Sequence, residues 1–217
     1  MSPRVRDGTI ADYEVFARLS PALGIPDPLL TTAQFEEQML PNVVIAEDGE
    51  PVGYAHWRYY GATVHVVHVV VEEQVRRRGV GRLMLEEVRR RAVARGCSRW
   101  YLNVKTDNAP AMRLYERSGF SVEQRGWSIV ADWSVLRTLA GSTSALRFEP
   151  SAEDAGRFAR EHGLDPDRLA LVRARSGVVS VALRDDAGLC AIAAFDPAFP
   201  GIPAIAVARP RACAAAL

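Results

Sequence analysis

Short runs of apolar, β-branched residues alternate along this chain with segments whose apolar positions recur at helical spacing. Residues 64–71 form one such run, broken by His65 and His68, and this pattern is typical of a buried central strand. Directly after it, apolar residues recur among charged ones from Gly81 to about Arg95, which predicts an amphipathic helix. A short basic loop that contains two glycines joins this strand to this helix.

The same patterns predict further elements on both sides of this strand and helix. Upstream we expect a strand at residues 4–6, a helix from Thr9 to residue 19, a helix at residues 32–39, and a hairpin of strands at residues 43–47 and 52–59. Downstream we expect a strand at residues 100–104, a helix from Asn108 to Gly119, and a closing hairpin of strands at residues 120–124 and 127–133. The expected order is therefore βααβββαβαββ, an α/β pattern.

The composition limits the classes of function without naming one. The chain has 217 residues, of which 48% are hydrophobic, enough for one large or two small domains with packed cores. A formal net charge of +1 argues against nucleic acid or a membrane surface as a partner, because the chain as a whole would attract neither. The three cysteines, Cys97, Cys190 and Cys213, lack metal-ligand spacing and suit a reducing compartment, and no signal peptide or membrane span is visible. We therefore expect a cytoplasmic protein without a metal.

The basic loop after residues 64–71 has the features of an anion site. The first N–H groups of a helix have no partner within the helix, the helix dipole adds partial positive charge there, and glycine lets a phosphate approach closely. The spacing is neither that of a nucleoside triphosphate loop nor that of a dinucleotide fingerprint. It is Arg-x-x-Gly-x-Gly, at Arg76, Gly79 and Gly81. From the loop alone, an ordinary basic turn between strand and helix stays open as an alternative.

A second block of sequence decides how this loop is interpreted. Residues 108–120 read Asn-Ala-Pro-Ala-Met-Arg-Leu-Tyr-Glu-Arg-Ser-Gly-Phe and fit the pattern Asn-x-x-Ala-x-x-Leu-Tyr-x-x-x-Gly-Phe. Together the loop and this block resemble the two signatures of the GCN5-related N-acetyltransferase (GNAT) family, in the right order and separation. The resemblance covers about residues 3–134. It implies the GNAT fold, a mixed and mostly antiparallel twisted sheet flanked by helices, in a domain at residues 1–134.

The resemblance also implies that the cosubstrate is acetyl-CoA. The loop would offer backbone donors to the pyrophosphate, with arginine side chains as outer charge, and the strand before it would pair through its backbone with the pantetheine arm. Asn108 would lie near that arm. The residues expected to contact the cosubstrate are Val69, Val70, Val71, Arg76, Arg77, Arg78, Gly79, Val80, Gly81, Arg82 and Asn108.

Acetyl transfer to an amine needs a neutral amine, a stabilised carbonyl oxygen and a stabilised leaving thiolate. An alkylamine with a pKa of about 10.4 is almost fully protonated at neutral pH, so a general base is expected. We propose His65, because several family members carry Glu or His at the matching place, and strand alternation would put it on one face with Val69 and Val71, opposite His68. The resemblance assigns Tyr115 to the sulfur, where hydrogen bonding is easier than full proton transfer. The alternatives are a solvent-facing or core histidine and a packed aromatic residue.

Residues 135–217 are surplus to this domain and show an internal similarity. Residues 7–18 align without gaps with residues 149–160, and the identical pairs are Asp12/Asp154, Phe16/Phe158, Ala17/Ala159 and Arg18/Arg160. Residues 178–195 also repeat the strand–turn–strand pattern of residues 43–59. This predicts a second, incomplete copy of the family's N-terminal half. Chance similarity between two capped helices is the alternative.

The sequence therefore predicts an N-acetyltransferase that moves the acetyl group of acetyl-CoA directly to a primary amine of a small molecule or peptide. The catalytic domain is followed by a linker at residues 135–144 and by the half-copy at residues 145–217, which has no Arg-x-x-Gly-x-Gly and cannot hold CoA. Because half a sheet leaves an open edge, the half-copy would pack on the first domain or in a homodimer. A non-catalytic acyl-CoA-binding sensor or interaction module stays open as the alternative function.

Overall fold

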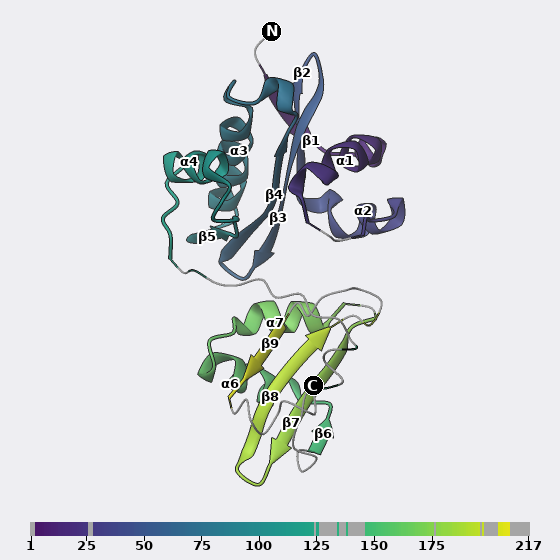
Figure 1. Ribbon diagram of the computed structural model, residues 1–217, viewed down its shortest axis with the longest axis vertical. Helices are drawn as coiled ribbons and strands as arrows, with labels where there is room; N and C mark the ends of the chain where they lie inside the picture. The colour runs from purple at the N-terminus through teal and green to yellow at the C-terminus, as the bar shows by residue number, and fades with distance from the viewer. Residues whose placement is uncertain are drawn as a thin grey trace. The chain divides into compact units, whose positions relative to one another are not determined.

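Two units make up the chain, and each is described by itself. The computed structural model describes residues 3–25, 28–123, 146–175, 177–195 and 204–208, together with the single residues 125, 134, 138 and 197. The first unit is Met1–Arg125 and the second is Gly126–Leu217. Figure 1 labels the helices and strands of both units.

The first unit is organised around a five-stranded sheet in the order β1-β2-β3-β4-β5. Its strands are β1 Arg4–Asp7, β2 Val43–Asp48, β3 Glu50–Tyr60, β4 Thr63–Val71 and β5 Arg99–Leu102. The pairs β1/β2, β2/β3 and β3/β4 are antiparallel, whereas β5 runs parallel to β4. The expected hairpin is formed by β2 and β3, and its turn needs Gly49 because the backbone there has a φ of +88°. A mixed, mostly antiparallel sheet between helices confirms the fold class expected from the sequence.

Helices cover both faces of this sheet, with α1 and α2 on one side and α3 and α4 on the other (Figure 1). Their bounds are η1 Ile10–Asp12, α1 Tyr13–Leu19, η2 Ser20–Leu23, α2 Thr32–Gln38, η3 Leu40–Asn42, η4 Glu73–Val75, α3 Val80–Ala94 and α4 Ala109–Arg117. The core under α1 and α2 contains Phe16, Phe35, Met39, Tyr54 and Val70. The core under α3 contains Trp57, Val64, Val66, Met84, Leu85 and Val88. Since each fully buried apolar side chain stabilises the fold by about 1.5–3 kcal/mol, these two cores fix β4 from both faces.

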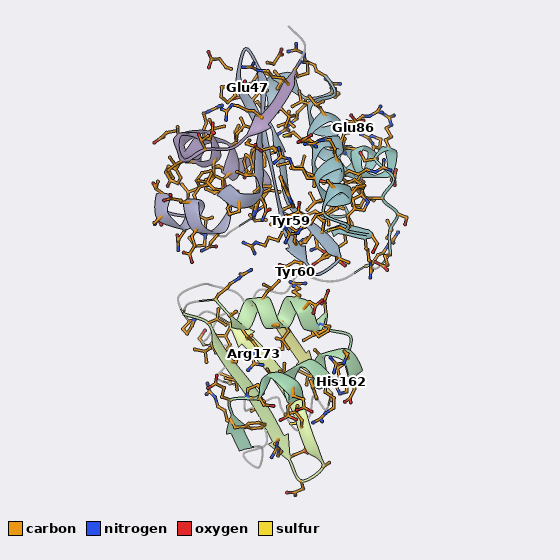
Figure 2. The ribbon with its side chains drawn as sticks, turned by 180° about the vertical axis from the view of Figure 1, so that it is seen from behind. Glu47, Tyr59, Tyr60, Glu86, His162 and Arg173 are labelled. Atoms are coloured by element: carbon orange, nitrogen blue, oxygen red, sulfur yellow. The ribbon has the colours of Figure 1, made fainter. Side chains whose placement is uncertain are left out.

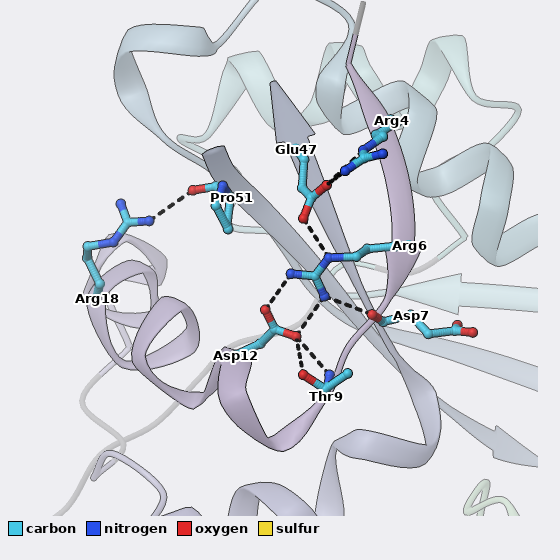
Figure 3. A network of polar contacts seen from close by, with 8 residues as sticks. All are labelled: Arg4, Arg6, Asp7, Thr9, Asp12, Arg18, Glu47 and Pro51. Atoms are coloured by element: carbon cyan, nitrogen blue, oxygen red, sulfur yellow. Dashed lines mark hydrogen bonds and ion pairs between the residues drawn. The ribbon is translucent and has the colours of Figure 1, made fainter. Parts of the chain in front are cut away.

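A polar network ties the first strand and the first helical turn to the sheet (Figure 3). Arg6 on β1 donates to both carboxylate oxygens of Asp12, at 2.7 and 2.8 Å, and to Glu47 on β2 at 2.6 Å. The Asp12 carboxylate also accepts from the Thr9 backbone N–H at 2.8 Å. Burial by itself would raise the pKa of Asp12, but the hydrogen bonds from Arg6 and Thr9 outweigh burial and lower that pKa. The helix start expected at Thr9 is therefore held by a charged network as well as by local capping.

The second unit has a four-stranded antiparallel sheet in the order β6-β7-β8-β9. Its elements are β6 Leu146–Phe148, α6 Ala152–Glu161, α7 Pro166–Arg173, β7 Val179–Asp185, β8 Gly188–Phe195 and β9 Ala204–Val207. The helices pack on the sheet through Phe158, Leu169 and Ile192. This order of one strand, two helices and three strands is also the order of β1, α1, α2, β2, β3 and β4.

The first strand of the closing hairpin expected after α4 is not found over the residues that the structure describes. Residues 120–123 are not in a strand. Phe120 instead stacks on Trp100, with 4.0 Å between the ring centroids. A strand needs a neighbouring strand to satisfy its backbone groups, and the expected partner at residues 127–133 lies outside the described residues.

Candidate active site

The loop between β4 and α3 presents backbone donors that the helix does not use. Gly79 is the N-cap of α3, its φ is +86°, and no side chain caps the helix. The first backbone bond of the helix runs from the Leu83 N–H to the Gly79 carbonyl, at 3.0 Å. The N–H groups of Val80, Gly81 and Arg82 lie ahead of that bond. Such donors at the positive end of a 15-residue helix attract an anionic group.

The arginine side chains of this loop are largely engaged within the protein. Arg76 donates from Nε to the Val71 carbonyl at 3.0 Å. Arg78 pairs with Asp48 at 2.8 Å, and Arg82 pairs with Glu86 at 2.8 Å. Arg77 is exposed, has a φ of +64°, and shows no ion pair among the described residues. The backbone of the loop is therefore the primary anion-binding element, and three of its four arginines shape the loop.

β4 and β5 pair only over their first residues. The parallel register runs from Thr63 with Arg99 to Val66 with Leu102, and residues 67–71 of β4 have no partner on β5. An extended ligand with amide groups can pair with such an unpaired strand edge as an added strand would. Val69 and Val71 lie on this segment, which leads directly into the basic loop. A compact anion and an extended amide chain could therefore be held next to each other here.

Two of the predicted residues belong to helix α4, which begins after Asn108 and contains Tyr115. The Asn108 side chain accepts from the Ala111 N–H at 3.2 Å and so caps α4. Tyr115 is half-buried in the α3-side core, its ring lies 5.8 Å from that of Phe120, and its hydroxyl has no hydrogen-bond partner among the described residues. Burial raises the pKa of Tyr115, which makes it a weaker acid and favours hydrogen bonding over proton donation.

Close packing holds α4 against the start of α3. A Cβ atom on Gly81 would lie 2.9 Å from Cδ2 of Leu114 on α4. The second glycine of the loop therefore has a packing role, because a side chain there would displace the end of the Leu114 side chain. Tyr115 follows Leu114 directly on α4 and packs against the same core.

A shallow groove of about 260 Å³ lies between α3 and the end of α4. Its basic side chains are Arg82, Arg89 and Arg117, and Trp100 lines it as well. Glu86, which Figure 2 labels, is the acidic residue on its wall. The groove extends the positively charged surface of the loop along α3.

A β-bulge in β4 changes the face on which its histidines lie. The pairing shifts between His56 and Trp57 of β3, which leaves Val67 as an extra residue of β4. His65 before the bulge and His68 after it consequently lie on the same face of the sheet, the one covered by α1 and α2.

Valines on either side of the bulge show this directly. The residues of β4 that pack in the α3-side core are Val64, Val66, Val69 and Val71, so the core-facing positions change from even to odd numbers. The expectation that His65 shares a face with Val69 and Val71, opposite His68, is therefore wrong. Strict alternation fails because a bulge inserts one unpaired residue.

The histidines on this face occupy different surroundings. His65 stacks on Tyr101 of β5, with 4.5 Å between ring centroids and 4° between ring planes, and its ring lies 6.3 Å from that of Tyr60. The His68 ring lies 5.6 Å from that of His56. Burial lowers the pKa of His68 to about 4 and that of His56 well below its usual value, and the positive charge of Arg58 lowers both further.

Sequence reasoning missed three members of this face, His56, Arg58 and Tyr101. His56 and Arg58 lie two residues apart on β3 and Tyr101 lies on β5, and only pairing across the sheet brings Arg58 and Tyr101 beside His65 and His56 beside His68. The described residues contain no group of three or more His, Cys, Asp or Glu that could hold a metal ion. Nor does any helix described here have the length and apolar character needed to cross a membrane.

Comparisons with known proteins relate this geometry to others. Residues 13–120 match the family model described as acetyltransferase (GNAT) family. Thialysine N-epsilon-acetyltransferase from Bos taurus is 28% identical over 151 residues, which cover 61% of this chain and 86% of that protein. N-alpha-acetyltransferase from Sulfurisphaera tokodaii is 27% identical over 133 residues, which cover 54% of this chain and 79% of that protein. A solved aminoglycoside N-acetyltransferase in complex with CoA shares the fold, with a TM-score of 0.51, 20% identity, and coverage of 59% of this chain and 94% of that one.

Proposed function

Because residues 13–120 of this chain belong to the acetyltransferase (GNAT) family, we propose that its first unit transfers the acetyl group of acetyl-CoA directly to a primary amine of a small molecule or peptide. The observation that carries this proposal is the uncapped start of α3 next to the unpaired edge of β4. Both relatives named above are acetyltransferases of amino groups by their names, and the aminoglycoside enzyme was solved with CoA.

The proposed cosubstrate site combines the loop with the edge of β4. The N–H groups of Val80, Gly81 and Arg82 would receive the pyrophosphate, with Arg77 as an outer charge. The backbone of residues 69–71 would pair with the amides of the pantetheine arm, and Asn108 would lie beside it. When bound, acetyl-CoA supplies the activated thioester.

Acetyl transfer requires a base for the amine proton and hydrogen-bond donors to the carbonyl oxygen and to the leaving sulfur, both of which become negatively charged. His65 is the proposed base, directly or through a water molecule, since a neutral imidazole can accept the amine proton near neutral pH. A backbone N–H near Val71 is the proposed donor to the carbonyl oxygen. Tyr115 is the proposed hydrogen-bond donor to the leaving sulfur, consistent with its unpartnered hydroxyl and raised pKa.

Calorimetric binding of acetyl-CoA to the wild type and to a Gly79→Glu variant tests the cosubstrate site. We expect tight binding to the wild type and its loss in the variant, because a carboxylate at the N-cap repels the phosphates. Gly163→Glu is the matched control, since Gly163 also has a positive φ (+76°) with open space around it, but lies in the second unit. Equal binding by all three proteins would overturn the proposed site.

The alternative function is a non-catalytic acyl-CoA sensor or interaction module. Thiol release from acetyl-CoA in the presence of a broad amine panel distinguishes it from a transferase. The transferase predicts turnover that falls by about 10- to 100-fold in Tyr115→Phe with acetyl-CoA affinity unchanged. The sensor predicts acetyl-CoA binding without turnover in either protein.

We also propose that the second unit, at residues 145–217 after a linker at residues 135–144, is a partial GNAT-like repeat. The shared order of elements and the alignment of residues 7–18 with residues 149–160 support this proposal. Its β9 has no second neighbouring strand among the described residues, and a homodimer would cover that edge. Analytical ultracentrifugation would test the dimer. The free thiols of Cys97 and Cys190 are consistent with a cytoplasmic location.

A further inference from the structure

A cluster of polar side chains lies on the α1/α2 face of the sheet, next to the point where β4 and β5 separate. We call it the acceptor-face cluster, and its members are His56, Arg58, His65 and His68. Arg58 belongs to this face because its neighbours Trp57 and Tyr59 face the other way. Their rings lie under the guanidinium groups of Arg91 in α3 and of Arg95 at its C-terminal end, at 5.6 and 4.4 Å.

Arg58 has no counter-charge among the described residues, and the other arginines of the first unit that lack an ion pair there are exposed, whereas Arg58 is not. It is half-buried, and it forms no ion pair or hydrogen bond with any described residue. The short elements that lie over this part of the sheet, η2 and η3, contain no acidic residue. The acidic residues of α2, Glu36 and Glu37, are exposed. A half-buried guanidinium without a partner is unfavourable by itself and favourable once an anion binds to it.

The neighbouring histidines add donors that the protein leaves unused. His56 is only 1% exposed, yet neither ring nitrogen has a hydrogen-bond partner of good geometry among the described residues, although an interaction with the Gln38 backbone partly offsets the lowering of its pKa. Nδ1 of His68 is likewise buried without a partner. Buried polar atoms normally find partners, so this polar space is incomplete without a further group. The positive charge of Arg58 determines the sign of that group.

The position of the cluster relates it to the proposed chemistry. Arg58 and His65 are directly paired residues of β3 and β4, and β4 separates from β5 two residues after His65. We propose, on the basis of the function proposed above, that the acceptor is an amine that also carries a carboxylate, and that Arg58 binds this carboxylate while the amino group lies toward His65. The subsite would therefore select amino-acid-like acceptors over simple amines.

Matched pairs of acceptors test this proposal in the full-length protein. The pairs are β-alanine with β-alaninamide and lysine with lysinamide, and 2-aminoethylphosphonate serves as a second anionic group. We expect the wild type to prefer each carboxylate over its carboxamide by about 10- to 100-fold in kcat/KM. Arg58→Met should remove this preference mainly through KM and leave the carboxamides unchanged. Arg58→Lys should retain part of it, and Arg4→Met, which removes an exposed arginine on β1, should have no effect.

The outcomes separate this proposal from the function on which it rests. Equal turnover of carboxylates and carboxamides by the wild type, or an equal loss for both in Arg58→Met, would overturn the carboxylate subsite and leave the transferase intact. Preference for the phosphonate over both carboxylates would overturn the choice of carboxylate. Failure to bind acetyl-CoA would overturn the transferase.

A binding measurement gives a readout that does not depend on turnover. The ring resonances of His68 should shift in nuclear magnetic resonance spectra when β-alanine is added and stay unchanged with β-alaninamide. The same titration of Arg58→Met should produce no shift. A shift that persists in Arg58→Met, or no shift in the wild type, would contradict the proposal.

Discussion

Replacing His68 by phenylalanine should remove much of the acid sensitivity of the first unit. His68 lies between Tyr54 and His56, with ring centroids 6.0 and 5.6 Å away, and its Nδ1 makes no hydrogen bond. A phenyl ring has a similar shape and leaves no buried donor behind. At about pH 8 the substitution should therefore change the free energy of unfolding by no more than about 1 kcal/mol.

The pKa of His68 determines the size and the sign of the effect. Burial lowers this pKa from 6.5 to about 4 in the folded state, so the unfolded state binds the proton more tightly. The associated stability is present above about pH 6.5 and is lost as the pH falls toward 4. At pH 5, about 97% of unfolded but only about 10% of folded molecules carry the proton, which corresponds to a loss of about 2 kcal/mol. Burial also lowers the pKa of His56, so protonation of His56 should destabilise the first unit as the pH falls. His68→Phe should therefore reduce the acid sensitivity without abolishing it.

Hydrogen exchange of peptides that cover β3 and β4, corrected for the intrinsic effect of pH on exchange, measures this quantity in the first unit alone. The loss of stability between about pH 8 and pH 5 should be smaller in His68→Phe than in the wild type by about 2 kcal/mol. His162→Phe, at the exposed end of α6 in the second unit, is the control and should follow the wild type. Parallel losses in His68→Phe and the wild type would refute the reasoning, because they would mean that His68 titrates normally.

Three further substitutions test the packing described above. Gly81→Ala should cost the first unit about 1 kcal/mol of stability and weaken acetyl-CoA binding, because its Cβ would lie 2.9 Å from Cδ2 of Leu114 and displace that side chain. Leu114→Ala in the same chain should remove this close contact, and calorimetry measures both effects. Asn108→Ala should cost about 1 kcal/mol in thermal unfolding through loss of the α4 cap, whereas Asn108→Asp should keep it. Phe158→Ala, at a site only 3% exposed, should destabilise β7 and β8 by about 3–5 kcal/mol in hydrogen exchange and leave β3 and β4 unchanged. An equal effect on both sheets would show that the two units do not unfold separately.

Local sequence was sufficient to predict those helices, strands and turns whose conformation depends on residues within the same segment. The bounds of β2, β3, α3 and α4 agree with the predicted ones within a few residues, because apolar periodicity, glycine turns and Asn108 as a cap act over short distances. The basic loop was predictable for the same reason, since the free donors of a helix start follow from the strand–loop–helix order alone. These features also identified the family and, with it, the proposed cosubstrate and the fold.

The arrangement of the acceptor-face cluster depends on pairing between strands that are distant in the sequence. Alternation along β4 predicted opposite faces for His65 and His68, and one bulge opposite β3 put them on the same face. A bulge is a property of two strands in register, so one strand's sequence cannot specify it. Among the described residues, the lack of a counter-charge for Arg58 and of hydrogen-bond partners for the His56 nitrogens likewise follows from which elements lie over the sheet. The sequence by itself determined the elements and the anion-binding loop, whereas tertiary structure decided which side chains share a face, because only packing fixes strand register and burial.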